Sequence, residues 1–277
     1  MITGNTRLIA HIGYPTHSFK APMIYNPYFE QNDIDTVVVP MGCRPEHYPA
    51  FLRSLFTLTN VAGALITMPH KIATLALLDE RSPAVRIAGA CNAVRRGANG
   101  RLIGDMFDGE GFVRGMLRKG CKLEGARLLV VGAGGVGSAI AASLAAAGSA
   151  EIRLFDVNAA AAEGLAKRLS DHYPALRVTV GSNDPDGCDL VVNCTPMGMH
   201  DGDPLPVDVS RIAPSAFVGE VVMKKETTAF LAAAAARGCR VQVGTDMLFE
   251  QIPAYLEFFG IPSTTPDILR GLAQIRY

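Results

Sequence analysis

Six residues near the middle of the chain form a glycine-rich loop of a type that holds phosphate groups. They satisfy the pattern G-x-G-x-x-G, directly after an apolar run typical of a strand and directly before an apolar helical segment. Such glycines allow a tight turn and a close approach to a pyrophosphate at the positive end of the helix. A ligand-free turn is the alternative, but the context favours dinucleotide binding. The loop comprises Gly132, Ala133, Gly134, Gly135, Val136 and Gly137.

Asp156 ends the next apolar segment and is the candidate for choosing between the two nicotinamide cofactors. It stands about 20 residues after the glycines, where its carboxylate could accept a hydrogen bond from the ribose 2′-OH of NAD and repel the 2′-phosphate of NADP. An arginine at or after this position would indicate NADP, but Val157 and Asn158 follow. The alternative is an aspartate that only caps the next helix. We expect NAD to be preferred, with NADP possible.

Lys71 is the candidate for proton transfer. The residues from Thr67 to Pro69 resemble the end of a strand that leads into a helix, which would place the ammonium near the positive end of that helix. This placement would favour the neutral, basic form of the lysine. A lone lysine is more often a solvated surface residue, so its role depends on a partner.

Several motifs occur in a specific order along the chain. They are Thr67-Met68-Pro69-His70-Lys71, Gly89-Ala90-Cys91-Asn92-Ala93-Val94, Gly104-Asp105-Met106-Phe107-Asp108-Gly109, Val192-Asn193-Cys194-Thr195-Pro196-Met197-Gly198-Met199 and Gly244-Thr245-Asp246-Met247-Leu248, with Gln251 after the last. In this order they resemble the shikimate/quinate dehydrogenase family over nearly the whole chain. The resemblance implies reversible NAD(P)-linked oxidation of a ring hydroxyl on a shikimate-like, quinate-like or related cyclic polyol.

The resemblance also implies roles for particular residues. Lys71 and Asp108 would be the catalytic pair: Lys71 would exchange the hydroxyl proton, and Asp108 would orient the lysine and the adjacent hydroxyl. Thr67, Asn92 and Gln251 match positions that hydrogen-bond substrate hydroxyls. Without the family, Asn92 would be read as a turn residue and Gln251 as a polar residue on a helix.

A second set of positions matches the family's cofactor contacts. Part of the set lies in the loop near the nicotinamide, and core packing is the alternative for its methionines. The set comprises Asn193, Thr195, Pro196, Met197, Met199, Val221, Gly244 and Met247.

The chain departs from the family where the substrate's carboxylate is usually held. An ungapped alignment places Phe19 and Ala21 at two serines, whereas a shift of one residue would place Ser18 and Lys20 there. Met223 stands at a tyrosine position. Three further replacements are Leu65 for an asparagine two residues before Thr67, and Met106 and Phe107 for the usual Asn-Thr before the aspartate.

These replacements run from polar to apolar, and a carboxylate buried there without donors would lose several kcal/mol. We therefore expect a small-molecule cyclic or small polyol whose non-reacting end is uncharged or apolar. A competing account lets Lys20, Lys224 or Lys225 bind an anionic substituent from a new direction, although Lys224 and Lys225 could form an ordinary solvated turn. A non-catalytic NAD-binding sensor and a different NAD enzyme, such as an amino-acid or folate dehydrogenase, remain alternatives.

Two α/β domains must position these groups. Short apolar runs alternate with helical segments throughout, which indicates mostly parallel sheets covered by helices. We expect a substrate-binding domain over residues 1–120 with the C-terminal helices 245–277, a Rossmann-type NAD(P)-binding domain over residues 121–244, and a cleft between them. The last two helices are expected in the segments 246–260 and 266–277.

Composition excludes several classes of partner and site. The 277 residues carry 26 Lys and Arg against 26 Asp and Glu, so neither nucleic acid nor a membrane surface is an expected partner. No apolar run or N-terminal segment suggests a membrane span or a signal peptide, which favours a cytoplasmic protein. Six dispersed cysteines show no zinc or disulfide spacing, so no metal is expected. The sequence indicates no oligomeric state.

Overall fold

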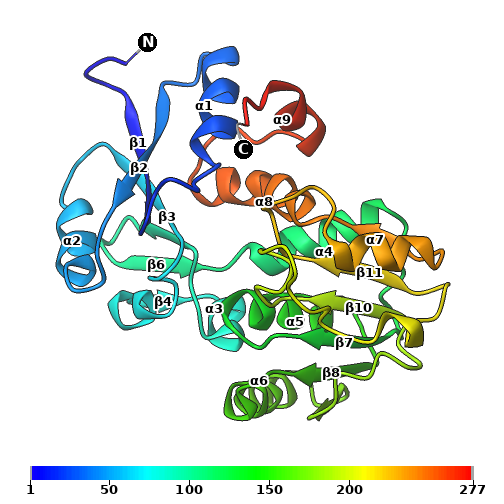
Figure 1. Ribbon diagram of the computed structural model, residues 1–277. Helices are drawn as coiled ribbons and strands as arrows, with labels where there is room; N and C mark the ends of the chain where they lie inside the picture. The colour runs from blue at the N-terminus through cyan, green and yellow to red at the C-terminus, as the bar shows by residue number, and fades with distance from the viewer. Residues whose placement is uncertain (1, 276–277) are drawn as a thin grey trace. The chain divides into compact units, whose positions relative to one another are not determined.

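The computed structural model describes residues 2–275, and packing divides the chain into two compact units (Figure 1). Unit 1 comprises Met1–Phe107 with Ile252–Tyr277, and unit 2 comprises Asp108–Gln251. Both are α/β, and their sheets are mostly parallel, as the sequence predicted. The expected domain limits, 120/121 and 244/245, differ from these divisions by up to thirteen residues, because the helix that begins at Asp108 packs within unit 2.

Unit 1 is built on a six-stranded mixed sheet in the order β2-β1-β3-β5-β6-β4. The pairs β1 with β2, β1 with β3 and β4 with β6 are parallel, whereas β5 is antiparallel to β3 and β6. The strands are β1 Arg7–Gly13, β2 Thr36–Gly42, β3 Val61–Ile66, β4 Glu80–Arg81, β5 Ala93–Arg96 and β6 Leu102–Asp105. The helical elements are α1 Pro22–Gln31, α2 Tyr48–Leu55, the 3₁₀ helix η1 Ala73–Leu77, α3 Pro83–Ala88 and α9 Pro266–Leu272.

Local sequence explains how two of these helices begin and end. A proline near the first helical position, as at Pro22 in α1, costs no hydrogen bond because the first amides of a helix are unpaired. In α3 the hydroxyl of Ser82 accepts a hydrogen bond from the Val85 amide at 3.2 Å, and Gly89 ends the helix with a φ of 64°.

The segment after Lys71 differs from expectation. The sequence suggested a helix directly after Pro69, but the residues form a turn followed by the five-residue η1. No α-helix begins there, so the expected effect of a helix dipole on the Lys71 ammonium is wrong.

The C-terminal segment packs on the first helix of unit 1. Helix α9 lies beside α1 in Figure 1, and the Gln274 amide donates to the Met23 carbonyl at 2.9 Å. The hydroxyl of Tyr28 donates to the carbonyl of Pro262 at 3.0 Å. These contacts join the end of the chain to its beginning.

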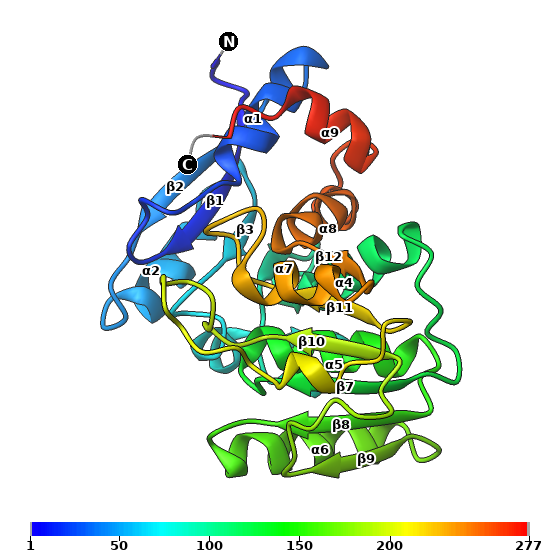
Figure 2. The same ribbon diagram turned by 45° about the vertical axis from the view of Figure 1, so that its right-hand side comes forward.

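Unit 2 has a six-stranded sheet in the order β12-β11-β10-β7-β8-β9, and every pair in it is parallel (Figure 2). Chain order reverses between β7 and β10, where doubly wound folds bind their ligands. The strands are β7 Arg127–Val131, β8 Glu151–Phe155, β9 Arg177–Val180, β10 Leu190–Asn193, β11 Phe217–Glu220 and β12 Arg240–Gln242. The helices are α4 Asp108–Arg118, α5 Gly135–Ala146, α6 Ala159–His172, η2 Val209–Arg211, α7 Ala229–Ala236 and α8 Gly244–Phe258, the last of which contains the division between the units.

Apolar strand residues of unit 2 meet the alanine-rich helix α7 in a core cluster. Val131, Val191 and Val218 from neighbouring strands pack with Phe230 and Leu231, all 2% exposed or less. The carboxyl ends of the parallel strands β7, β10 and β11 therefore lie along the same edge of the sheet. Within residues 2–275, no helix is both long and apolar enough to cross a membrane.

Candidate functional site

The glycine loop of unit 2 joins β7 to α5, and each glycine of the pattern has a distinct geometry. Gly132 has a φ of 104°, a conformation that side chains rarely adopt, and its amide donates to the Phe155 carbonyl at 2.7 Å. A Cβ on Gly137 would lie 1.9 Å from the Gly132 carbonyl oxygen, whereas a Cβ on Gly134 would meet no atom within 4 Å. The loop is therefore closely packed at Gly137 and open at Gly134. A loop that binds a pyrophosphate needs both features.

Asp156 lies directly after β8, against this loop. One carboxylate oxygen accepts the Ala133 amide at 2.6 Å, and the other accepts the Asn158 amide at 2.8 Å. The cap of α6 is Asn158, whose side chain accepts from the Ala161 amide at 3.3 Å. Asp156 is thus not the helix cap, and its negative charge lies beside the glycine loop. Val157, the next residue, is 88% exposed.

The loop after β10 is folded around the side chain of Asn193, which is fully buried. Its amide nitrogen donates to the Met197 carbonyl at 3.0 Å, and its oxygen accepts the amide and the hydroxyl of Thr195 at 3.0 and 2.6 Å. The Thr195 hydroxyl accepts in turn from the Met197 amide at 3.1 Å. The loop continues through Pro196 to Met199, which is 38% exposed.

The structure brings the two loops together at the point where strand order reverses. A Cβ on Gly132 would lie 2.9 Å from the carbonyl carbon of Cys194 and 3.1 Å from the Thr195 methyl group. Val221 joins the same edge, since its amide donates to the Asn193 carbonyl at 3.1 Å. This edge of unit 2 has the shape and the backbone donors to hold a dinucleotide.

Gly244 and Met247, two further candidates from the sequence, lie in the first turn of α8. A Cβ on Gly244 would lie 2.2 Å from the Val222 carbonyl oxygen, so α8 begins in close contact with the loop after β11. Met247 is 3% exposed, and its carbonyl would lie 2.7 Å from a Cβ on Gly111. Its position therefore helps to pack α8 on α4.

The proposed substrate residues of unit 1 cluster at the ends of β1 and β3. A Cβ on Gly13 would lie 2.4 Å from the Thr67 methyl group and 2.8 Å from both the Met68 carbonyl oxygen and the ring of Phe19. Only glycine fits between these groups. The contact also places the Phe19 ring beside Thr67. Ala21, the other residue aligned with a serine, is 7% exposed and precedes α1.

His11 belongs to the same cluster, and sequence reasoning missed it. Its ring stacks on Phe19 with centroids 4.0 Å apart and 25° between the planes. The side chain is 9% exposed, and its Nδ1 has no hydrogen-bond partner within the described part of the chain. Burial, together with the positive charge of Lys71, lowers the pKa of His11 to about 3. A histidine within an apolar strand was the available signal.

Asn92 and Phe107 are also joined in unit 1. The oxygen of the Asn92 side chain accepts from the Phe107 amide at 3.0 Å, and Asn92 is 1% exposed. The Phe107 ring packs on Tyr255 and Phe258, with centroids 4.8 and 5.6 Å away. Met106 is 3% exposed. The aromatic ring of Phe107 therefore contributes to the core beside α8.

The three remaining chemical candidates are distributed over both units. Lys71 lies in unit 1, where its carbonyl accepts from the Cys91 amide at 2.9 Å. Asp108, 4% exposed, is the first residue of α4 in unit 2. Gln251 is 7% exposed, and its Oε1 has no hydrogen-bond partner within residues 2–275. A Cβ on Gly111 would lie 2.6 Å from the Gln251 Cβ, so α4 and α8 pack closely at this point.

The loop after β11 carries Met223 and the two lysines considered for an anionic group. Met223 is partly buried, and both lysines are exposed. Lys225 is paired with Asp201, so its charge is already partly compensated. A hydrogen bond from Lys225 lowers the pKa of the Asp201 carboxyl, and one from the His200 amide lowers that of Asp203. The charge of Lys224 adds to both shifts.

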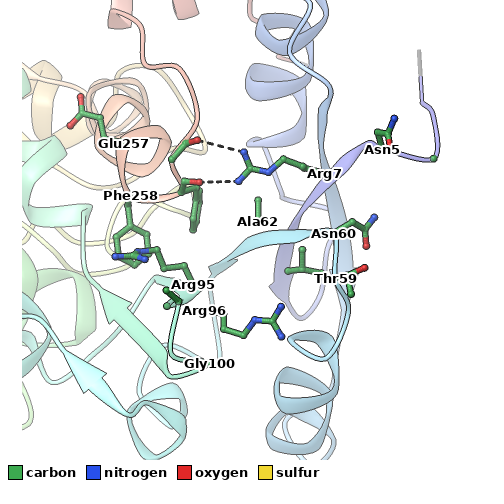
Figure 3. A pocket seen from close by; sticks show the side chains of 16 residues that line it. Asn5, Arg7, Thr59, Asn60, Ala62, Arg95, Arg96, Gly100, Glu257 and Phe258 are labelled. Atoms are coloured by element: carbon green, nitrogen blue, oxygen red, sulfur yellow. Dashed lines mark hydrogen bonds between the residues drawn. The ribbon is translucent and has the colours of Figure 1, made fainter.

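A cavity of about 990 Å³ in unit 1 lies away from these candidates (Figure 3). It is lined at the start of β1 and β3, whereas Gly13 and Thr67 lie at and beyond their ends. Arg7 donates there to the carbonyls of Phe259 and Gly260 at 3.1 and 3.5 Å. This cavity therefore does not mark the candidate site. No group of His, Cys, Asp and Glu suited to a metal ion occurs in residues 2–275.

Two family models match the chain. One, described as the shikimate dehydrogenase substrate binding domain, matches residues 11–94, and one described as the ThiF family matches residues 116–170. A shikimate dehydrogenase (NADP(+)) of Paramagnetospirillum magneticum is 33% identical over 98% of this chain and 99% of its own length. A protein of the same name from Geobacter metallireducens is 34% identical over 97% of this chain and 96% of its own length.

Solved structures show the same likeness. Shikimate 5-dehydrogenase from Listeria monocytogenes, in complex with shikimate and NAD, has a TM-score of 0.90 and 25% identity over 98% of this chain and 97% of its own. Quinate dehydrogenase from Corynebacterium glutamicum in complex with NAD has a TM-score of 0.86 and 29% identity over 96% and 98%. The ligand-free 5-ketofructose reductase of Gluconobacter sp. strain CHM43 has a TM-score of 0.88 and 25% identity over 98% of both chains. These matches confirm the resemblance that the motifs indicated.

Proposed function

The chain belongs to the shikimate dehydrogenase family of NAD(P)-dependent oxidoreductases, and from that premise we propose that it interconverts a hydroxyl and a carbonyl on a neutral cyclic or small polyol. Unit 1 would bind the substrate, and unit 2 would bind the dinucleotide. A non-catalytic sensor is not favoured, because the named relatives are enzymes. The unpaired thiols of all six cysteines support the cytoplasmic location expected from the sequence.

The glycine loop supports the assignment of the cofactor to unit 2. Open space over Gly134 and the backbone amides at the start of α5 suit a pyrophosphate. Asn193, Thr195, Pro196, Met197 and Met199 would form the nicotinamide side, with Val221, Gly244 and Met247 beyond it. The two loops follow β7 and β10, which are neighbouring strands of one sheet, and this favours a preformed site.

NAD is the cofactor we propose to be preferred. Asp156 carries its negative charge beside the glycine loop, where a ribose 2′-phosphate would be repelled, and the exposed Val157 supplies no positive charge. The curated relatives are named for NADP(+), whereas the Listeria and Corynebacterium structures contain NAD. In cofactor preference, this chain would therefore differ from the curated relatives described above.

The bound cofactor supplies a hydride acceptor in the forward direction and a hydride donor in reverse. Lys71 takes up the hydroxyl proton as the carbonyl forms, and Asp108 orients the reacting groups. Thr67, Asn92 and Gln251 hold substrate hydroxyls. The unpartnered Oε1 of Gln251 is an acceptor that a substrate hydroxyl would satisfy.

The observation that carries the neutral-substrate proposal is the position of Phe19. Its ring lies against Gly13 and stacks on His11, where the alignment places a serine hydroxyl in the family. Leu65 is buried on the neighbouring strand. The side chains of Phe19 and Leu65 offer no donor to a carboxylate packed against them, and burying a charge without partners costs several kcal/mol. The name of the Gluconobacter neighbour denotes reduction of a neutral sugar, which agrees with this assignment.

A panel of substrates tests the proposal. Shikimate, quinate, 5-ketofructose and neutral cyclic polyols are each assayed with both cofactors, as oxidation or reduction according to the compound. We expect kcat/KM for the best neutral compound to exceed that for shikimate and quinate by at least about tenfold. Efficient turnover of shikimate or quinate would refute the neutral-substrate proposal. Absence of turnover with every compound would count against the enzyme assignment.

A further inference from the structure

We propose that His11 is a substrate-selecting residue, whose neutral imidazole hydrogen-bonds a hydroxyl or carbonyl at the non-reacting end of an uncharged polyol. The inference rests on the proposed function and deepens it. It replaces the expectation of a wholly apolar substrate end with one polar, uncharged contact.

Strand register places His11 in the candidate site. His11 pairs with Leu65 across the parallel strands β1 and β3. Because side chains two residues apart share a face of a sheet, His11 and Gly13 lie on one face, as do Leu65 and Thr67. The close contact of Gly13 with Thr67 shows that these two faces are the same. His11 therefore stands on the face that carries Thr67, one of the proposed hydroxyl-binding residues.

The imidazole has an unmet hydrogen-bonding capacity. Nδ1 is buried and unpartnered, and the side chain is 9% exposed. A buried polar atom without a partner typically costs about 1–3 kcal/mol, so a ligand that satisfies the Nδ1 of His11 would recover part of that free energy on binding. Phe19 stacks on the ring, which restrains the orientation of the imidazole plane.

The charge state of His11 decides which ligand it suits. Burial lowers its pKa, and the nearby positive charge of Lys71 lowers it further, to about 3. At neutral pH the ring is uncharged and offers one donor and one acceptor. Such a group matches a hydroxyl, which can both donate and accept, and lacks the positive charge that would compensate a carboxylate.

The neighbours of His11 complete the substrate class. The side chains of Phe19 and Leu65 offer apolar surface on which a carbon skeleton could pack. His11, which contacts Phe19 and pairs with Leu65, is the polar group beside them. The family's aligned asparagine and serine positions are apolar here, beside a histidine that sequence reasoning did not assign. We infer a substrate whose carbon skeleton packs on Phe19 while one remote oxygen reaches His11.

Two variants of His11 separate hydrogen bonding from packing. In His11→Val the strand keeps a β-branched apolar residue but loses the imidazole, whereas in His11→Asn an amide stands near the position of Nδ1. With the best neutral substrate of the panel, we expect His11→Val to raise KM about tenfold or more while kcat changes less than about threefold. We expect His11→Asn to recover most of the lost affinity. His172→Val, at the exposed end of α6, is the control.

The outcomes distinguish this inference from the proposed function. If the wild type turns over the neutral substrate and a folded His11→Val has an unchanged KM, His11 does not select the substrate, although the proposed function stands. If shikimate or quinate binds more tightly than every neutral compound and His11→Val removes that preference, the inferred substrate class is wrong.

A binding measurement covers the case in which nothing is turned over. Imidazole ¹⁵N resonances of the wild type are recorded while 5-ketofructose, a cyclic polyol or shikimate is added without cofactor, and His11→Asn identifies the His11 signal. A shift in the Nδ1 resonance with a neutral compound supports the inference even if the proposed reaction fails. No shift with any neutral compound overturns it.

Discussion

The carbonyl oxygen of Gly132 occupies the space next to Gly137 so closely that a Cβ atom on Gly137 would lie 1.9 Å from it. The same loop leaves open space at Gly134, whose φ of −69° suits any residue. Gly137 is therefore required for the packing of the loop, whereas Gly134 leaves room for a ligand. Substitutions at these two glycines of the glycine loop therefore test folding and cofactor binding separately.

Gly137→Ala should lower stability, whereas Gly134→Ala should lower NAD affinity. Gly137→Ala forces a backbone clash, so we expect Tm to fall by about 5 °C or more. Gly134→Ala should leave Tm within about 1 °C but weaken NAD binding about tenfold or more, because its methyl group enters the pyrophosphate space. Thermal unfolding and calorimetric titration with NAD measure the two effects. Unchanged NAD affinity in Gly134→Ala would remove the pyrophosphate from this loop.

Lys71→Ala should abolish proton transfer while sparing the cofactor site. General acid–base catalysis contributes about 10²–10⁴-fold, so we expect kcat/KM for the best panel substrate to fall by that factor. The Kd for NAD should stay within about twofold, since the glycine loop belongs to unit 2. Lys122→Ala removes an exposed lysine and is the control. A Lys71→Ala enzyme with most of its activity would show that another group carries the proton.

Cofactor preference should reverse with two substitutions after β8. The wild type should show a kcat/KM with NAD at least about tenfold above that with NADP. Asp156→Ser with Val157→Arg removes the negative charge and adds a positive one, so NADP should become the better cofactor. Steady-state kinetics with both cofactors provide the measurement, and Leu58→Arg, an exposed position in unit 1, controls for added charge. Equal efficiency of the wild type with both cofactors would contradict the role of Asp156.

Glu220 should make the stability of unit 2 depend on pH. The side chain is fully buried at the end of β11, one oxygen accepts from the Thr228 hydroxyl at 3.0 Å, and the other has no partner within residues 2–275. Burial raises its pKa from 4.5 to about 7. The folded protein therefore holds this proton more tightly than the unfolded chain, which stabilises it at low pH.

That stabilisation should decline as pH rises from about 4.5 to about 7, by about 3 kcal/mol at most. Glu220→Gln keeps a neutral group of the same shape, so it should remove this part of the pH dependence and raise the free energy of unfolding at pH 8. Denaturant unfolding between pH 5 and 8 provides the data. Glu163→Gln, on the exposed face of α6, is the control for losing one carboxylate. Parallel pH profiles for the wild type and Glu220→Gln would contradict the prediction.

Local pattern was sufficient for the longer elements and for the cofactor loop. The apolar run before the glycine loop predicted β7, and the alternation of apolar runs with helical segments predicted the α/β class. The short strands β4 and β5 escaped notice because two to four residues carry too little periodicity to be recognised. The domain limits and the roles of the site residues stay predictions.

The segment after Lys71 was wrongly expected to begin a helix, because its apolar residues have helical spacing. Tertiary contacts hold a turn there instead. His70 stacks on Tyr48 with centroids 4.0 Å apart, and its Nε2 lies 2.8 Å from the Cys43 carbonyl oxygen. The Tyr48 hydroxyl lies 2.6 Å from the Thr74 hydroxyl. These bonds to residues far away in the chain outweigh the local preference for a helix.

The sequence by itself determined the family and the cofactor motif, because glycines at fixed spacing and an acid after the next strand are local in the chain. Only the tertiary structure decided which side chains surround the proposed substrate residues of unit 1. Strand pairing places His11 beside Leu65 of β3. The loop between β1 and α1 carries Phe19, whose ring stacks on the imidazole. Sequence alone cannot tell a buried histidine with an unmet hydrogen bond from one satisfied in the core, since that difference depends on neighbours brought together by folding.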